Sequence, residues 1–215
     1  MILVPVKILA NAKQRLAGVL DQFSRTELAH AMLQDVLEAL AQSSADEVSL
    51  VTSDPFALEL AGQHHFAIIR DDSNLSETAA IEMATRDCES RGIQTTLVIP
   101  GDIPLIEPAD VRAIYQAAPA SGTVLVPAAD QRGSNAVLRR PAALFPLRFG
   151  NDSFMPHLTA AISTHKTCVV LSLPRIALDI DTPEDLQQLV NAEGSKKSQL
   201  LARKLGFPEA AAVKP

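Results

Sequence analysis

Short apolar runs rich in β-branched residues alternate with longer segments of helical periodicity along this sequence. This alternation is typical of an α/β fold, in which helices cross over between neighbouring parallel strands. Several of the runs contain hardly any polar position, so we expect their strands to be covered on both faces. The predicted strands span residues 2–6, 47–52, 66–69, 96–100, 123–127, 135–138 and 167–173.

Start signals for helices stand between these strands. Ser24 and Glu27 form an S-x-x-E pattern, which predicts that Ser24 caps the first long helix. A proline follows Asp54 and another follows Glu107, at the first helical position, where the missing N–H is not needed. In DTPEDLQQLV, Thr182 precedes such a proline and is predicted to cap the last helix of the core.

The chain of 215 residues fits one large domain, because its hydrophobic content of 47% is enough for a well-buried core. No linker or repeat interrupts the pattern early on, so we predict a single domain over residues 1–191 and a C-terminal helix and tail over residues 192–215. No apolar run approaches the roughly 18 residues of a membrane helix, and no basic leader precedes the first strand. We therefore expect a cytoplasmic protein that does not contact a membrane.

Charge and aromatic content restrict the class of ligand. A net charge of -6 and an aromatic content of 4% argue against nucleic-acid binding. A small anion is still compatible with Lys7, Lys13 and Arg15, which follow the first strand, where α/β sheets often hold phosphates. Taken alone, this cluster is equally compatible with a solvated basic loop. The stretch lacks the G-x-G-x-x-G and G-x-x-x-x-G-K-[ST] patterns, which argues against a dinucleotide-binding fold and a P-loop ATPase.

Three aspartates predict a metal site. Asp102, in PGDIP, follows a buried strand and has no basic residue nearby in the sequence to balance its charge. In ALDIDTPEDL, the alternation of an extended segment places Asp179 and Asp181 on one face, with Ile180 opposite. Such carboxylates suit Mg²⁺, which also binds phosphate oxygens. The structural alternatives are that Asp102 caps the turn before the next helix and that Asp181 assists a helix cap.

Two further segments carry candidate substrate ligands. In FGNDSFMPHL, a turn at Gly150 precedes Ser153 at a predicted helix start, where free N–H groups favour an anion. His157 lies one turn further along, and on its own it is more typical of a half-buried helix histidine. In DQRGSNAVLRR, Ser134 and Asn135 precede a strand, a pattern that on its own is typical of a hairpin turn. No G-x-S-x-G elbow or Cys/His pair is present, which argues against covalent hydrolase chemistry.

Taken in order, PVKILANAKQRLAG, GDIPL, RGSNAVLRRP, FGNDSFMPHL and LDIDTPEDL resemble the CofC/FbiD family of phospho-acid guanylyltransferases of coenzyme F-420 biosynthesis. The resemblance spans about residues 1–190. It implies a single Rossmann-like domain of GT-A type, with a mostly parallel mixed sheet flanked by helices. The implied reaction transfers GMP from GTP to the phosphate of a phosphorylated three-carbon acid and releases pyrophosphate. The product would pass to the next enzyme of the pathway, and a homodimer is compatible with the resemblance.

The resemblance also implies roles for individual residues. The implied nucleotide ligands are Lys7, Lys13 and Arg15, and the implied ligands of Mg²⁺ are Asp102, Asp179 and Asp181. The implied catalytic residues are Asp102, Lys13 and Asp179, and the implied substrate ligands are Ser134, Asn135, Gly150 and Ser153. Family members use phosphoenolpyruvate, 3-phospho-D-glycerate or 2-phospho-L-lactate. This sequence departs from the family pattern after Leu75, at Ser134 and after Gly150, which favours an acceptor other than 2-phospho-L-lactate.

Other functions remain open at this point, because single motifs of this set recur elsewhere. The patterns G-D-x-P and DTPEDL also occur in nucleotidyltransferases that act on sugar phosphates or molybdopterin. A GT-A glycosyltransferase would use Asp-Ile-Asp as its D-x-D metal motif, although that motif normally lies in the middle of the chain. A non-catalytic module would bind GTP and release no pyrophosphate.

Overall fold

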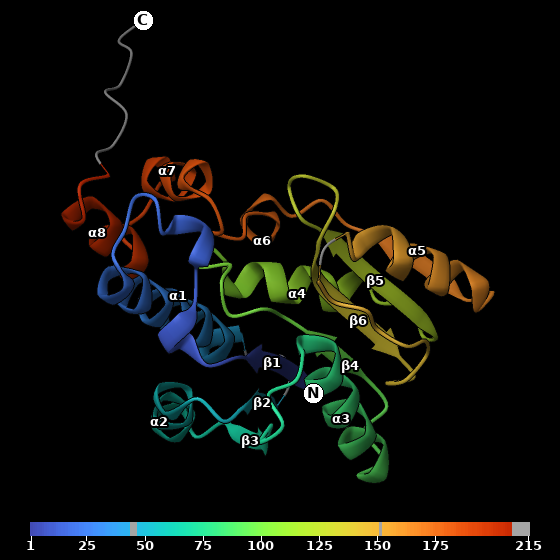
Figure 1. The fold of residues 1–215 in the computed structure, drawn as a ribbon. Helices are drawn as coiled ribbons and strands as arrows, with labels where there is room; N and C mark the ends of the chain where they lie inside the picture. The colour runs from blue at the N-terminus through green and yellow to red at the C-terminus, as the bar shows by residue number, and fades with distance from the viewer. Residues whose placement is uncertain (44–46, 151, 208–215) are drawn as a thin grey trace, which may run out of the picture.

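The structure is a computed structural model that describes residues 1–43, 47–150 and 152–207. Strands and helices alternate along the chain (Figure 1). The strands are β1 (Ile2–Val6), β2 (Val48–Thr52), β3 (Ala67–Arg70), β4 (Thr96–Val98), β5 (Gly122–Pro127), β6 (Ser134–Arg140) and β7 (Thr167–Val170). The helices are α1 (Gln22–Ser43), α2 (Pro55–His64), α3 (Glu77–Ser90), α4 (Pro108–Ala117), α5 (Phe154–Ser163), α6 (Pro174–Ala177), α7 (Pro183–Asn191) and α8 (Lys197–Lys204), with short 3-10 turns η1 (Leu9–Asn11) and η2 (Gln14–Leu16).

The described residues form a seven-stranded sheet in the order β3-β2-β1-β4-β6-β5-β7. Strand β6 runs antiparallel to its neighbours β4 and β5, and the other paired strands are parallel. The predicted α/β fold with a mostly parallel mixed sheet is therefore confirmed. Each predicted strand is present. β1 has the predicted ends, and the other six strands differ from the prediction at one or both ends, most of all where β7 stops at Val170, three residues early.

Helices cover both faces of the sheet, and each face has its own hydrophobic core. In β1, Ile2, Val4 and Val6 belong to one core and Leu3 to the other, as the alternation of side chains along a strand requires. Helices α1, α2 and α4 complete the first core, and α3 and α5 complete the second. A third cluster lies between α1, α7 and α8. None of the described helices is both long and apolar enough to cross a bilayer.

Helix α1 begins earlier than the S-x-x-E pattern predicts. It starts one residue after Asp21, whose carboxylate accepts a hydrogen bond of 2.7 Å from the backbone N–H of Ser24. The prediction that Ser24 caps this helix is therefore wrong, because an acidic residue three positions earlier takes the role. The other predicted starts are confirmed: Asp54 and Thr182 cap α2 and α7, and Glu107 precedes the first residue of α4.

Helix α8 packs on the same body although it lies beyond the predicted boundary at residue 191. Asp35 of α1 is buried, and its carboxylate accepts hydrogen bonds of 2.9 Å from the backbone N–H groups of Lys197 and Ser198. Ala202 of α8 belongs to the third cluster. In Figure 1, α7 and α8 lie beside α1, at the side of the molecule away from α5. The predicted C-terminal helix is thus confirmed, while the predicted tail beyond residue 207 lies outside the described residues.

The order of the strands places a crevice between β1 and β4. The chain adds β2 and β3 on one side of β1, and β4 then pairs with its other side. Ligands of doubly wound sheets bind beyond the carboxyl ends of the strands at such a switch point. The loop after β1 and the turn after β4 therefore face each other. Because β6 is antiparallel, its first residues reach the same edge of the sheet.

Candidate functional site

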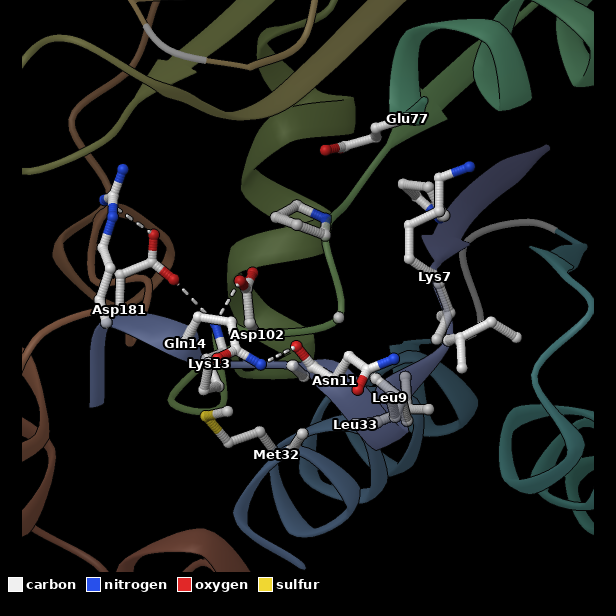
Figure 2. A pocket seen from close by; sticks show the side chains of 18 residues that line it. Lys7, Leu9, Asn11, Lys13, Gln14, Met32, Leu33, Glu77, Asp102 and Asp181 are labelled. Atoms are coloured by element: carbon white, nitrogen blue, oxygen red, sulfur yellow. Dashed lines mark hydrogen bonds and ion pairs between the residues drawn. The ribbon is translucent and has the colours of Figure 1, made fainter. Parts of the chain in front are cut away.

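Two adjoining cavities open at the carboxyl edge of the sheet. The first, of about 460 Å³, lies between the loop after β1, the turn after β4 and α1 (Figure 2). The second, of about 280 Å³, is lined by the β5–β6 hairpin and by the segments before α5 and α7. The two cavities share five residues, namely Arg15, Glu77, Pro100, Asp102 and Asp181. They form one cleft with two halves.

Lys13 bridges two of the shared carboxylates. Its Nζ donates to Asp102 at 2.7 Å and to Asp181 at 3.0 Å, and its side chain is only 8% exposed. Burial on its own would lower the pKa of Lys13, but the two carboxylates outweigh it and raise the pKa above its usual value. The charge of Asp102 is thus balanced by a lysine 89 positions away, which the local sequence did not reveal.

The backbone of the loop after β1 holds Lys13 in this place. Lys13 has a φ of 55°, in the left-handed region that few residues other than glycine adopt, and it lies between η1 and η2. The loop is anchored on one side by Leu9, whose N–H donates to Asp54 at 2.9 Å. On the other side, Leu16 is fully buried in the third cluster. The lysine therefore projects from a loop that is fixed at both ends.

Lys7 and Arg15, the other predicted nucleotide ligands, also line the first cavity. Arg15 pairs with Asp181 at 3.3 Å, and its side chain is 64% exposed. Lys7 instead donates to Asp71 at 2.7 Å, a buried carboxylate that also anchors the loop before α3. Figure 2 shows Lys7 across the cavity from Asp181. The structure thus brings the three predicted cations to one cavity, with Lys7 apart from the other two.

Asp179 lines the second cavity and is held by Asn135. The side-chain amide of Asn135 donates to Asp179 at 2.9 Å and to the carbonyl oxygens of Ile176 and Ala177 at 3.0 and 3.2 Å. Burial raises the pKa of Asp179 above its usual value, against the hydrogen bond from Asn135, and the charge of Asp102 adds to the rise. Asn135 therefore positions a carboxylate, and its predicted contact with substrate stays a prediction.

Ser134, Ser153 and His157 form a buried network beside the second cavity. The N–H of Ser134 donates to Ser153 Oγ at 3.0 Å, and Ser134 Oγ lies 2.9 Å from His157 Nδ1. The backbone N–H of Arg148 donates to His157 Nε2 at 2.9 Å. His157 is 1% exposed, so it is more buried than the sequence predicts. Gly150 completes the cavity wall with a φ of 116°, which glycine adopts readily.

Glu77 is a cleft residue to which sequence analysis assigned no role. It is the first residue of α3, and its side chain points into the cleft in Figure 2. Burial, and then the charge of Asp102, raise the pKa of Glu77 to about 7. An acidic residue in the first turn of a helix is common because it interacts well with the helix dipole. The sequence therefore gave no signal that this carboxylate faces a cavity.

Asp102, Asp179 and Asp181, the predicted metal ligands, all line the second cavity. Within residues 1–43, 47–150 and 152–207, no three carboxylate, imidazole or thiol side chains converge closely enough to hold a metal ion. Lys13 contacts two of the three aspartates in this conformation. The three aspartates line one cleft, and their role as metal ligands stays a prediction.

The structure also decides between the alternatives for single residues. Among the described residues, the carboxylate of Asp102 accepts from Lys13 and from no backbone N–H, so it does not cap the turn before α4. The start of α4 is held by Asp110, which accepts from the N–H of Glu107. The carboxylate of Asp185, rather than that of Asp181, accepts from the N–H of Thr182 at the start of α7. The hairpin interpretation of DQRGSNAVLRR is confirmed, since β5 and β6 pair antiparallel. The same hairpin lines the second cavity, so its role as a turn is compatible with a role in binding substrate.

His157 predicts a pH dependence of stability. Burial, and then nearby Arg139, lower the pKa of His157 from 6.5 to about 4. Between these values the unfolded chain binds a proton that the folded protein does not, so the free energy of unfolding should decrease as the pH is lowered from about 6.5 to about 4, by roughly 3 kcal/mol in total. His157→Gln should lack this component. Denaturant titrations between about pH 4.5 and 7.5 measure it, and equal slopes for the two proteins would contradict a buried neutral imidazole.

Relatives named as guanylyltransferases match nearly the whole chain. A family model described as "Guanylyl transferase CofC like" matches residues 1–213. The chain is 38% identical over 192 residues to a phosphoenolpyruvate guanylyltransferase from Rubrobacter xylanophilus, which covers 89% of this chain and 93% of the relative. It is 33% identical over 206 residues to a 2-phospho-L-lactate guanylyltransferase from Methanothermobacter thermautotrophicus, which covers 95% of this chain and 90% of the relative.

Solved structures share the fold at lower identity. A candidate nucleotide-diphospho-sugar transferase from Desulfovibrio desulfuricans G20 matches with a TM-score of 0.77 at 21% identity, over 94% of this chain and 93% of that chain. A Mycobacterium tuberculosis protein crystallised with manganese matches with a TM-score of 0.54 at 20% identity, over 87% of this chain and 96% of that chain. This likeness confirms the predicted GT-A-type fold. The family match and the relative at 38% identity show that the chain is a nucleotidyltransferase and belongs to the CofC-like guanylyl transferase family.

Proposed function

We propose that this protein transfers GMP from GTP to the phosphate of phosphoenolpyruvate and releases pyrophosphate. The observation that carries the proposal is the single cleft whose two cavities share Arg15, Asp102 and Asp181. Transfer between two substrates requires two adjoining sites that hold the reacting groups within reach of each other. The shared aspartates mark the place where the two substrates would meet.

The first cavity suits the nucleotide. Lys7, Lys13 and Arg15 bring positive charge to it, while Met32 and Leu33 of α1 supply an apolar wall. Fixed cations offset the charge of a triphosphate, and apolar side chains suit the face of a base. We therefore place the triphosphate beside Lys13 and Arg15, with the base toward α1.

The second cavity suits a small phosphorylated acid. It is the smaller of the two, at about 280 Å³, and Ser134, Gly150 and Ser153 line it. Among the three acids of the family we choose phosphoenolpyruvate, because the relative at 38% identity carries that name. The departures from the family pattern after Leu75 and at Ser134 support this choice over 2-phospho-L-lactate. The reaction would then be a cytoplasmic step of coenzyme F-420 biosynthesis.

We further propose that Asp102, Asp179 and Asp181 bind a divalent cation, with Mg²⁺ as the expected ion. The chemistry of the three side chains suits such an ion, since carboxylate oxygens are its preferred protein ligands and all three line one cavity. To bind it together they would have to come closer than they lie in this structure, where Lys13 contacts two of them. The manganese complex of a Mycobacterium tuberculosis protein of the same fold supports a divalent ion. When bound, the cation would offset part of the charge of the triphosphate.

The acceptor would supply its own nucleophile. The second pKa of a phosphomonoester is about 6, so the acceptor phosphate is largely dianionic near neutral pH and needs no general base. Two unit charges about 4 Å apart repel by roughly 4 kcal/mol near a protein surface. The chain must therefore align two anions and offset their repulsion, with Lys13 and Arg15 on the triphosphate and Ser134 and Ser153 on the acid.

Pyrophosphate release tests the proposal. The purified protein is incubated with MgCl₂, with GTP or ATP, and with one of the three acids of the family. We expect release with GTP and phosphoenolpyruvate at a rate at least about tenfold above that of every other pair, and loss of release when the metal is chelated. A faster reaction with another of the three acids would overturn the choice of acceptor. GTP binding without release of pyrophosphate would indicate a non-catalytic module. Release of pyrophosphate with a sugar phosphate or molybdopterin as the acceptor would indicate a different nucleotidyltransferase.

A further inference from the structure

We propose that His157 is a positioning residue, which obliges the hydroxyl group of Ser134 to donate its hydrogen to the acid acceptor. The proposal rests on the proposed function, because it assigns a role within the acceptor half of the cleft. His157 does not line either cavity, so it would act through Ser134 rather than on the substrate.

The tautomer of His157 follows from its two hydrogen-bond partners. A backbone N–H can only donate, so Nε2, which lies 2.9 Å from the nitrogen of Arg148, is the unprotonated ring nitrogen. A neutral imidazole then carries its hydrogen on Nδ1. That nitrogen lies 2.9 Å from Ser134 Oγ, so His157 donates to Ser134. Burial lowers the pKa of His157 to about 4, so the ring is neutral at the pH of the reaction.

This donation fixes the direction of the Ser134 hydroxyl hydrogen. Because Oγ accepts from His157, its own hydrogen must point elsewhere, and Ser134 lines the second cavity. Ser153 Oγ is likewise engaged as an acceptor, by the N–H of Ser134 at 3.0 Å. Among the described residues, neither hydroxyl has a hydrogen-bond acceptor for its own hydrogen. The cavity therefore presents two O–H donors, which match an anionic oxygen such as the carboxylate of the acceptor.

The support behind Ser134 is rigid. The segment that holds His157 Nε2 is itself fixed, since the N–H of Phe149 donates to Thr78 Oγ1 of α3 at 2.9 Å. The three donors Arg148 N–H, His157 Nδ1–H and Ser134 O–H thus form a chain that is directed at the cavity. Such a chain strengthens each hydrogen bond in it and favours an anion at its end.

Two histidine variants with opposite defects test the proposal. His157→Asn retains a donor near the position of Nδ1, whereas His157→Gln retains an acceptor near the position of Nε2. We expect His157→Gln to raise the KM for phosphoenolpyruvate about tenfold, and to leave the KM for GTP and kcat close to wild type. His157→Asn should change the KM for the acid by less than about threefold. Asparagine at exposed His165, whose φ of 54° suits it, is the matched control.

A double-variant cycle separates positioning from general support. Ser134→Ala should raise the KM for the acid, and His157→Gln should add nothing in that background, because the histidine acts through the serine. Additive effects, or an equal rise in the KM for GTP, would overturn the proposal.

The tautomer itself can be measured without a substrate. The ¹⁵N resonances of the imidazole ring distinguish a protonated Nδ1 from a protonated Nε2, and either His157 variant identifies the signals of this residue among the five histidines. A protonated Nε2 in the wild-type protein would overturn the proposal even if a variant fails to fold. Conversely, if the wild-type protein releases no pyrophosphate with any of the acids, the proposed function is rejected. The ¹⁵N spectrum would still show which tautomer His157 adopts.

Discussion

Asp102→Asn is expected to fold normally and to lose turnover by about a hundredfold or more. Asp102 is shared by both cavities and accepts a hydrogen bond from Lys13, so its charge acts where two anionic substrates would meet. Asparagine has nearly the same shape, and its carbonyl oxygen can accept the same hydrogen bond. The expected loss therefore comes from the charge alone. Pyrophosphate release at saturating GTP and acceptor measures it.

A surface aspartate provides the control for this variant. Asp87 of α3 pairs with Arg91 at 3.3 Å, and Asp87→Asn makes the same chemical change far from the cleft. Exposed ion pairs contribute little to stability, so this control should keep both its turnover and its melting temperature. Asp179→Asn should behave like Asp102→Asn. A wild-type rate for Asp102→Asn would exclude a role of this carboxylate in metal binding and in transfer.

Much of the fold could be predicted because burial on both faces leaves a distinct pattern. β1 is buried at every position, and only a strand covered by helices on two sides can be apolar throughout. The start of α1 could not be predicted as well. Both Asp21 and Ser24 are good capping residues, and the structure, rather than the local pattern, decides that Asp21 takes the role. Local patterns therefore specify elements better than their ends.

The location of the site could be predicted, but its pairings could not. Lys13 and Asp102 follow β1 and β4, and these strands are parallel neighbours, so the two side chains meet at one edge of the sheet. The partner of a charge depends on side-chain geometry across 89 or 168 positions, and no local spacing encodes it. The same holds for His157, whose partners lie on the β6 strand and on the segment before α5. The sequence predicted a metal ion beside Asp102. The structure places the ammonium group of Lys13 there, and the metal ion stays a prediction.

Lys13→Met is expected to lower kcat/KM for GTP by at least about a hundredfold. Methionine keeps much of the apolar stem and removes the ammonium that contacts Asp102 and Asp181. The variant should also be less stable at neutral pH. Burial would raise the pKa of Asp181, but Lys13 and Arg15 hold this pKa below its usual value. The ionised carboxylate therefore stabilises the fold at any pH above the pKa of Asp181 in the unfolded chain, and this stabilisation is lost as the pH falls. Without Lys13, this stabilisation should be largely absent. Steady-state kinetics and denaturant titration measure the two effects.

A double variant separates the two roles of Lys13. In Lys13→Met/Asp102→Asn, a neutral amide replaces one of the two carboxylates that have lost the lysine, so part of the lost stability should return. Activity should not return, because the triphosphate still lacks the ammonium and the cleft also lacks the charge of Asp102. Lys166→Met, at an exposed lysine after α5, controls for the loss of a positive charge as such. If the double variant regained turnover together with stability, Lys13 would serve only to neutralise Asp102, and its place beside the triphosphate would have to be abandoned.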